Sequence, residues 1–214
     1  MFLHDDADDA IARLVLAHGA GAAMDSGFMN NIAGLIAERG VSVTRFEFGY
    51  MAGRRDGGKR RPAPRGETLC SEYEAAIERI RNERDDDLAL FIGGKSMGGR
   101  VASLIAQQAF QKGVIHGLAC LGYPFHPPGK PEKLRTAHLA TLDCPALIVQ
   151  GTRDALGAKA EVATYDIDVR IGFLWCEDGD HDLKPRKRSG LSQADHLTAA
   201  ADAIAAFVRS PTPE

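Results

Sequence analysis

Residues Leu88–Arg100, LALFIGGKSMGGR, decide the fold class of this chain. The run Leu88–Ile92 is apolar throughout, which predicts a strand buried on both faces, and Met97–Phe110 has the apolar spacing of a helix. Between them, Gly94-Lys95-Ser96-Met97-Gly98 fits Gly-x-Ser-x-Gly in the strand–turn–helix context of a nucleophile elbow. A glycine-rich phosphate-binding turn also suits this context, but the full dinucleotide fingerprint and the P-loop pattern are absent.

Similar apolar runs alternate with segments of helical period along the rest of the chain. Strands are predicted at 11–17, 41–48, 88–92, 114–121, 146–150 and 170–176, and helices at 26–38, 67–81, 97–110 and 191–208. Apolar strands joined by helices favour a parallel sheet that is covered on both faces. With right-handed crossovers, the pattern predicts a three-layer, doubly wound α/β fold with a mostly parallel sheet of about six strands. We expect one domain over 1–214, with 1–10 and 209–214 loose.

The composition excludes several classes of protein. The 214 residues carry 26 Lys and Arg against 29 Asp and Glu, and a net charge of −3 gives no general attraction to nucleic acid or acidic membranes. No apolar run approaches the roughly 20 residues of a membrane-spanning helix, and the acidic N-terminus does not fit a signal peptide. We therefore expect a soluble, cytoplasmic protein with no nucleic-acid or membrane partner.

The cysteines are widely spaced and form no Cys-x-x-Cys pair. Most of them lie in or beside the apolar runs, where a free cysteine behaves as a small hydrophobic residue. Zinc ligation needs clustered ligands. We predict no metal site and four reduced thiols, at Cys70, Cys120, Cys144 and Cys176.

Polar residues follow three of the other predicted strands. Asp154 lies in the loop Gly151-Thr152-Arg153-Asp154 that follows 146–150, and His181 lies in an Asp-rich loop after 170–176. With Ser96 they occur in the chain order Ser, Asp, His, which is the order of α/β-hydrolases. His18-Gly19-Ala20-Gly21 follows the first predicted strand, where half of an oxyanion hole is expected. Asp154 is a better partner for the imidazole than the neighbouring Asp178, Asp180 and Asp182, because adjacent loop residues seldom face the ring.

Taken together, these segments resemble the α/β-hydrolase superfamily, and in particular the small lid-less serine hydrolases related to dienelactone hydrolases. The resemblance spans nearly the whole chain and is carried by LAHGAGAAMDS (16–26), GGKSMGGR (93–100), VQGTRDALG (149–157) and GDHDL (179–183). Dienelactone hydrolases use a cysteine nucleophile where this chain has Ser96, so their substrate does not carry over. The short N-terminus implies a trimmed sheet.

The resemblance implies a role for each of these residues. His181, oriented by Asp154, would take the proton from Ser96 as the serine attacks an acyl carbon. The backbone N–H groups of Met97 and Ala20 would hold the oxyanion, and no cofactor is required. We expect His18 to brace its turn rather than to react.

A lid of several helices cannot fit into the 22 residues of 122–143, which four prolines stiffen. We therefore expect a shallow, open site. The predicted substrate-lining residues are His18, Gly19, Gly21, Tyr123, Phe125 and His126.

The stretch 53–66 holds six basic residues and one acid, and it follows the strand predicted to end at Phe48. It can be a solvated loop, since charge runs are usually solvated, or it can attract an anionic acyl substrate. Both interpretations remain open at this level.

The sequence favours a serine hydrolase that cleaves a carboxylic ester, a thioester or a related acyl bond in a small molecule. A peptidase or amidase with the same triad is an alternative, because the motifs do not separate amide from ester. A non-catalytic protein-interaction module on the same fold is another, and fold alone does not decide between them.

Overall fold

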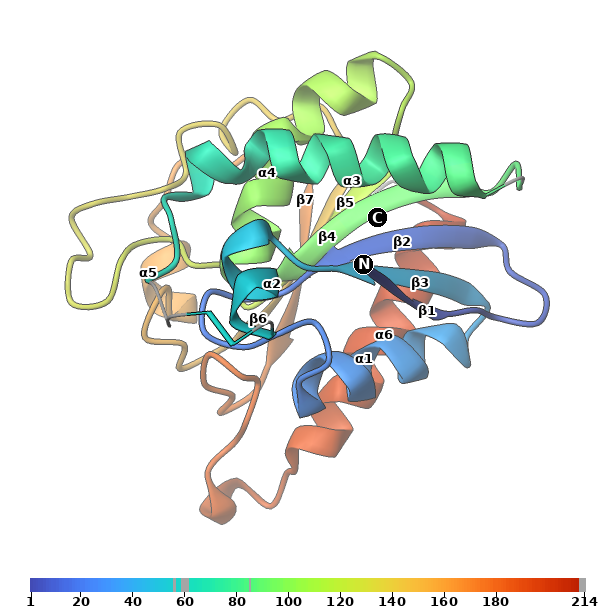
Figure 1. Ribbon diagram of the computed structural model, residues 1–214. Helices are drawn as coiled ribbons and strands as arrows, with labels where there is room; N and C mark the ends of the chain where they lie inside the picture. The colour runs from blue at the N-terminus through green and yellow to red at the C-terminus, as the bar shows by residue number, and fades with distance from the viewer. Residues whose placement is uncertain (56, 59–61, 85, 212–214) are drawn as a thin grey trace.

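The computed structural model describes residues 1–55, 57–58, 62–84 and 86–211. A single sheet of seven strands organises them, in the order β1-β3-β2-β4-β5-β6-β7 (Figure 1). Every neighbouring pair is parallel except β1 with β3. The strands are β1 (Phe2–Asp5), β2 (Ala12–Ala17), β3 (Val41–Phe46), β4 (Ala89–Lys95), β5 (Gly117–Leu121), β6 (Ala146–Gly151) and β7 (Ile171–Cys176).

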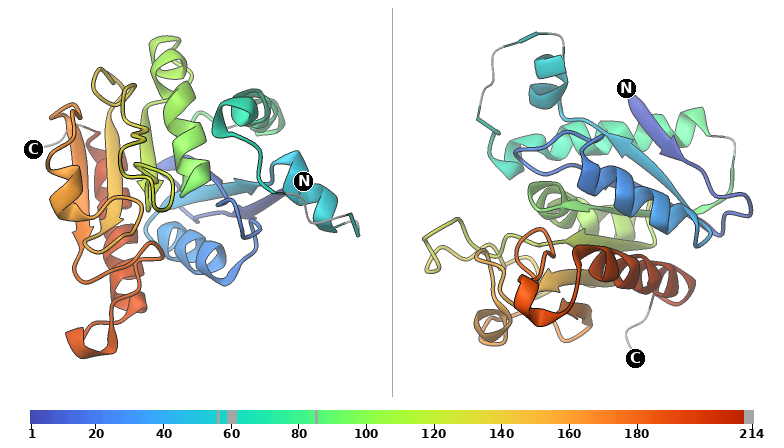
Figure 2. Two further views of the ribbon diagram at one scale, coloured as in Figure 1. Left: turned by 90° about the vertical axis from the view of Figure 1, so that its left-hand side faces the viewer. Right: turned by 90° about the horizontal axis from the view of Figure 1, so that it is seen from below.

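Helices cover both faces of this sheet. One apolar core lies between the sheet and the helices α3 and α4, and a second lies between the sheet and α1 and α6 (Figure 1, Figure 2). Strands β2, β3, β5 and β6 are buried along their whole length because both faces meet helices. The helices are α1 (Gly27–Ala37), α2 (Gly49–Arg55), α3 (Cys70–Glu83), α4 (Met97–Gln111), α5 (Lys159–Val162) and α6 (Gln193–Arg209), with 3₁₀ turns at Gly66–Leu69 and Lys187–Ser189. The predicted three-layer α/β fold is therefore confirmed.

The N-terminus departs from the expectation of a loose segment. Residues Phe2–Asp5 form β1, a seventh strand that pairs antiparallel with β3 at the edge of the sheet. An ion pair of 2.8 Å between Asp5 and Arg45 ties this strand to β3. Four residues with two polar side chains carry too little periodicity to predict a strand, so only the pairing with β3 reveals it.

The other end of the chain is partly ordered by α6. Arg209 is the last residue of that helix, and its guanidinium donates a hydrogen bond of 3.0 Å to the backbone oxygen of Arg39. The expectation that the chain is loose from Arg209 onward is therefore wrong at its first residue. Residues 212–214 lie outside the described residues.

Two features are absent from the described part of the chain. None of the helices described there is long and apolar enough to cross a bilayer. The same residues contain no group of three His, Cys, Asp or Glu side chains placed to hold a metal ion. The four cysteines are free thiols, three of them buried and Cys70 half-buried.

Candidate active site

The elbow after β4 holds Ser96 in an unusual backbone conformation, with φ +53° and ψ −116°. Such a conformation is strained for a residue with a side chain and persists only where the surroundings impose it. Gly94 and Gly98 permit it because the chain passes very close to both. A Cβ on Gly94 would lie 2.5 Å from the carbonyl carbon of Gly98, and a Cβ on Gly98 would lie 2.5 Å from the oxygen of Ala17. The elbow therefore raises the Ser96 hydroxyl at the carboxyl edge of the sheet.

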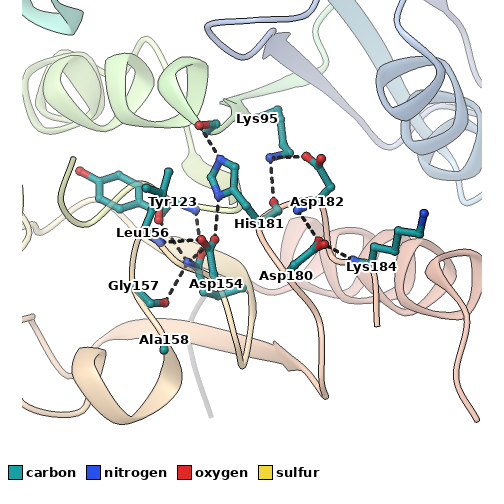
Figure 3. A network of polar contacts seen from close by, with 12 residues as sticks. Lys95, Tyr123, Asp154, Leu156, Gly157, Ala158, Asp180, His181, Asp182 and Lys184 are labelled. Carbon is teal, nitrogen blue, oxygen red and sulfur yellow. Dashed lines mark hydrogen bonds and ion pairs between the residues drawn. The ribbon is translucent and has the colours of Figure 1, made fainter. Parts of the chain in front are cut away.

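Three side chains from different strand ends form one hydrogen-bonded chain (Figure 3). The Ser96 hydroxyl donates to Nε2 of His181 across 2.8 Å, and Nδ1–H of His181 donates to Oδ2 of Asp154 across 2.8 Å. These are hydrogen-bond distances across which a proton can be exchanged. The structure thus brings together the three residues that the sequence singles out.

Asp154 is completely buried, yet both of its oxygens accept hydrogen bonds. Gln150 Nε2 donates to Oδ2 across 2.8 Å and the backbone N–H of Leu156 donates to Oδ1 across 2.8 Å. These two donors hold the carboxylate in one orientation towards His181. The acids next to His181 in sequence point elsewhere, since Asp178 pairs with Arg186 and Asp182 pairs with Lys95.

Lys95, the residue before the nucleophile, is a site residue that the sequence reasoning missed. Its Nζ donates to the backbone oxygen of His181 across 2.8 Å and lies 3.1 Å from Oδ1 of Asp182, so it links the elbow to the imidazole loop (Figure 3). The side chain is 9% exposed, and this burial lowers the pKa of Lys95. A lysine at the end of an otherwise apolar strand is the only sequence signal for this contact.

The loop 18–21 after β2 lies against the nucleophile. A Cβ on Gly19 would be 3.7 Å from the Cβ of Ser96, so this loop and the elbow lie close together. His18 braces the loop, since Nδ1–H donates to the oxygen of Gly19 across 2.7 Å and Nε2 accepts from the N–H of Phe48. Burial lowers the pKa of His18, which suits a neutral ring with one donor and one acceptor nitrogen.

Backbone donors are available on the other side of the serine as well. Met97 is the first residue of α4, and the first N–H groups of a helix have no partner within it. Negative charge that develops near a helix start is also stabilised by the helix dipole. Ala20, Met97 and Ser96 border the same hollow.

Two open hollows meet at Ser96 and Ala20. The larger, of about 660 Å³, extends over α4 and the segment after β5, and its walls include Met97, Pro124 and Leu156. The smaller, of about 370 Å³, is bordered by His181, Lys95 and Phe28. The segment 122–145 between β5 and β6 contains no helix and therefore forms no helical lid.

The expected lining of the site needs correction. Tyr123, Phe125 and His126 are buried, at 3% exposure or less, and line neither hollow. Their rings turn inwards because aromatic surface is buried more favourably than it is exposed. His18 is also fully buried. The residues of segment 122–145 that do form the wall of the larger hollow are Pro124, Pro128 and Arg135. Gly19 and Gly21 border the smaller hollow.

The basic stretch splits into parts with different surroundings. Arg54 and Arg55 end α2, and Arg55 is neutralised by ion pairs of 2.7 Å each with Glu47 and Asp25. Arg65 borders the larger hollow. Asp56, Lys59, Arg60 and Arg61 lie outside the described residues.

A seven-stranded, mostly parallel sheet with a serine elbow after β4, and with Asp and His after β6 and β7, defines the class of α/β-hydrolases. Residues 10–209 match the family described as Alpha/beta hydrolase domain, and the chain belongs to that family. The protein is therefore a hydrolase.

Solved structures of similar fold come from several bacteria. Dienelactone hydrolase from Anabaena variabilis is 19% identical, with a TM-score of 0.71 over 97% of this chain and 90% of that one. Est1E from Butyrivibrio proteoclasticus is 14% identical, with a TM-score of 0.68 over 98% and 93%. A serine hydrolase without a lid from Xanthomonas campestris is 16% identical, with a TM-score of 0.61 over 98% and 86%. At these identities the likeness concerns the fold.

Proposed function

We propose that the protein is a serine hydrolase that cleaves a carboxylic ester, a thioester or a related acyl bond through an acyl-enzyme. The observation that carries this proposal is the continuous hydrogen-bonded chain from Ser96 through His181 to the buried Asp154. Nε2 of His181 lies 2.8 Å from Ser96 Oγ, and a buried carboxylate orients the same imidazole. This arrangement is typical of a nucleophilic serine and not of a serine with only a structural role.

In the first half of the reaction, Ser96 Oγ attacks the acyl carbon while Nε2 of His181 takes the hydroxyl proton. The carbonyl oxygen becomes an oxyanion, which the N–H groups of Met97 and Ala20 stabilise. The bond to the leaving group then breaks, and His181 returns the proton to it. In the second half, water attacks the acyl-serine while His181 takes a proton from the water. The bond between the acyl carbon and Ser96 Oγ then breaks, His181 returns the proton to Oγ, and the acid product leaves.

Asp154 remains a carboxylate throughout. It holds Nδ1–H of His181, so that Nε2 is the nitrogen that faces the serine, and it stabilises the imidazolium that forms. This assignment gives each of the three side chains a separate task.

The similar structures support acyl-bond hydrolysis. They include an esterase domain from Rhodothermus marinus, and Est1E has been solved with ferulic acid bound. The open hollows on either side of Ser96 suit small or extended acyl substrates rather than a long buried chain. The free thiols are typical of a reducing compartment, so the cytoplasm is the location that we propose.

Labelling with a fluorophosphonate probe tests the role of Ser96. We expect one covalent adduct at Ser96, no adduct in Ser96→Ala, and normal labelling in Ser71→Ala, whose exposed serine lies on α3. Kinetics on matched ester, thioester and dipeptide substrates then define the bond that is cleaved. Labelling that persists in Ser96→Ala, or ester cleavage that survives this substitution, overturns the proposal.

A further inference from the structure

The larger hollow next to Ser96 has three arginines in its wall. Arg65, Arg100 and Arg135 border it together with a single acid, Glu67. Arg100 pairs with Glu67, and this hydrogen bond lowers the pKa of the Glu67 carboxyl to about 2. Among the described residues, this wall therefore carries one negative charge against three positive ones.

Arg135 is the unusual member of the group. It is half-buried, and within the described residues its guanidinium makes no ion pair and no hydrogen bond, although the charge of Glu67 acts on it from a greater distance. Burial lowers the pKa of Arg135, and the positive charge of Arg100 lowers it further. A half-buried cation without an ion pair or a hydrogen bond destabilises the folded protein. Arg135 therefore does not serve stability at this position.

Arg100 is also poorly placed for stability. It lies in the first turn of α4, where the helix dipole disfavours a positive charge. Its side chain is 12% exposed, and its Nε atom is buried without a hydrogen-bond partner among the described residues. The two arginines repel each other, and each reduces the stability of the folded protein. Such a pair of cations beside a reactive serine is typical of a site that binds an anion.

The chemistry of His181 indicates which part of a substrate would reach these arginines. The imidazole gives its proton to the leaving group, so the leaving group must lie on the side of His181. His181 borders the smaller hollow and does not border the larger one. The acyl part of the substrate therefore extends into the larger hollow, along Met97, Pro124 and Leu156 towards the arginines.

We propose that the larger hollow selects acyl chains that end in an anionic oxyacid group, a carboxylate or a phosphate. Arg135 is the main contact, because within the described residues its guanidinium is not held by an ion pair or a hydrogen bond. Arg65 and Arg100 add to the positive potential. This inference rests on the proposed function, since it assigns the acyl side of the same site. Guanidinium groups bind both kinds of anion through paired N–H donors.

Two esters of equal length test the proposal. Mono-p-nitrophenyl adipate ends in a carboxylate, whereas p-nitrophenyl hexanoate ends in a methyl group. We expect kcat/KM to favour the adipate ester, and Arg135→Gln to reduce the adipate-to-hexanoate ratio about tenfold, as loss of a hydrogen bond to a charged group does. A phosphonate-ended ester of the same length separates phosphate from carboxylate preference.

The variant and its control follow from the contacts. Within the described part of the chain, the hydrogen bonds of Arg135 are made by its backbone, to Phe125 and Tyr123, so Arg135→Gln keeps those bonds. Arg188→Gln removes an exposed arginine that borders neither hollow and should leave the ratio unchanged. Equal kcat/KM for the two esters in the unsubstituted enzyme, or an equal fall for both in Arg135→Gln, overturns the proposal.

Failure of this inference can be told apart from failure of the proposed function. If neither ester is cleaved, the function is wrong, and calorimetry with monomethyl adipate and Ser96→Ala then decides the subsite alone. Binding that Arg135→Gln abolishes supports the anionic subsite. No binding, or binding that is indifferent to Arg135, overturns it.

Discussion

Replacing Lys95 by methionine tests whether the elbow and the imidazole loop must be held together for catalysis. The Lys95 ammonium donates to the His181 oxygen across 2.8 Å and lies 3.1 Å from Asp182, in a side chain that is 9% exposed. Methionine has a similar length and suits a buried position, so Lys95→Met removes the cation and keeps the packing.

The magnitude follows from these two contacts. A hydrogen bond from a charged donor to a carbonyl contributes about 1.5–3 kcal/mol. The pair with Asp182 adds less than about 1 kcal/mol, because that carboxylate is 67% exposed. Methionine also avoids the free-energy cost of burying an ammonium, so the loss of stability is smaller than this sum. A misplacement of about 1 Å can lower a rate about 100-fold, so we expect kcat to fall 10- to 100-fold.

The assay is steady-state kinetics on p-nitrophenyl hexanoate together with thermal unfolding. We expect the loss in kcat to exceed any change in KM, because the His181 loop serves the chemical step rather than the acyl side. Lys184→Met is the matched control, since that lysine lies on the same loop with an exposed side chain and should keep normal kcat. A kcat for Lys95→Met within twofold of the unsubstituted enzyme, or an equal loss in Lys184→Met, refutes the reasoning.

Three further substitutions test other parts of the structure. Asp154→Asn should lower kcat on the order of 10⁴-fold while circular dichroism shows an intact fold, because an amide no longer selects the reactive imidazole tautomer. Gly98→Ala should destabilise the protein by about 1–3 kcal/mol in urea unfolding, because the new Cβ would lie 2.5 Å from a backbone atom. Gly34→Ala is the control: a Cβ at this position on α1 would meet open space, so the substitution should stabilise the protein by up to about 1 kcal/mol. The Glu67 carboxyl has a pKa lowered from 4.5 to about 2 by Arg100, so its contribution to stability is present above pH 4.5 and is lost as the pH falls through 2. In Glu67→Gln, urea unfolding should therefore show a smaller loss of stability between pH 4.5 and 2 than in the unsubstituted protein. The difference should be less than about 1 kcal/mol, because the carboxyl is largely exposed. An equal loss in both proteins would contradict the assignment.

Much of the fold was predictable because its determinants are local. The apolar run that forms β4, the glycines around Ser96 and the apolar stripe of α4 all lie within a short stretch of sequence. The same holds for the strands before Asp154 and His181. Strand β1 was missed because four residues become a strand only through pairing with β3.

Features that depend on side-chain direction were less predictable. Tyr123 and Phe125 follow β5 at the catalytic edge, yet their rings pack inwards and leave Pro124 at the surface of the larger hollow. Sequence position places a residue at an edge but does not give the direction in which its side chain points. The contact of Lys95 with the His181 loop likewise joins residues that are far apart in the chain.

The sequence by itself predicted the strands β2 to β7, the helices α1, α3, α4 and α6, and the elbow at Ser96. It also predicted that Ser96, Asp154 and His181 lie together, because parallel strands bring their carboxyl ends to one edge wherever they lie in the chain. Tertiary structure alone decided how the site is supported and what surrounds it. Arg65, Arg100 and Arg135 come from three separate segments and meet only when those segments pack around one hollow. Strand periodicity carries information about neighbours in sequence, whereas the charge of a cleft is set by residues that only folding makes neighbours.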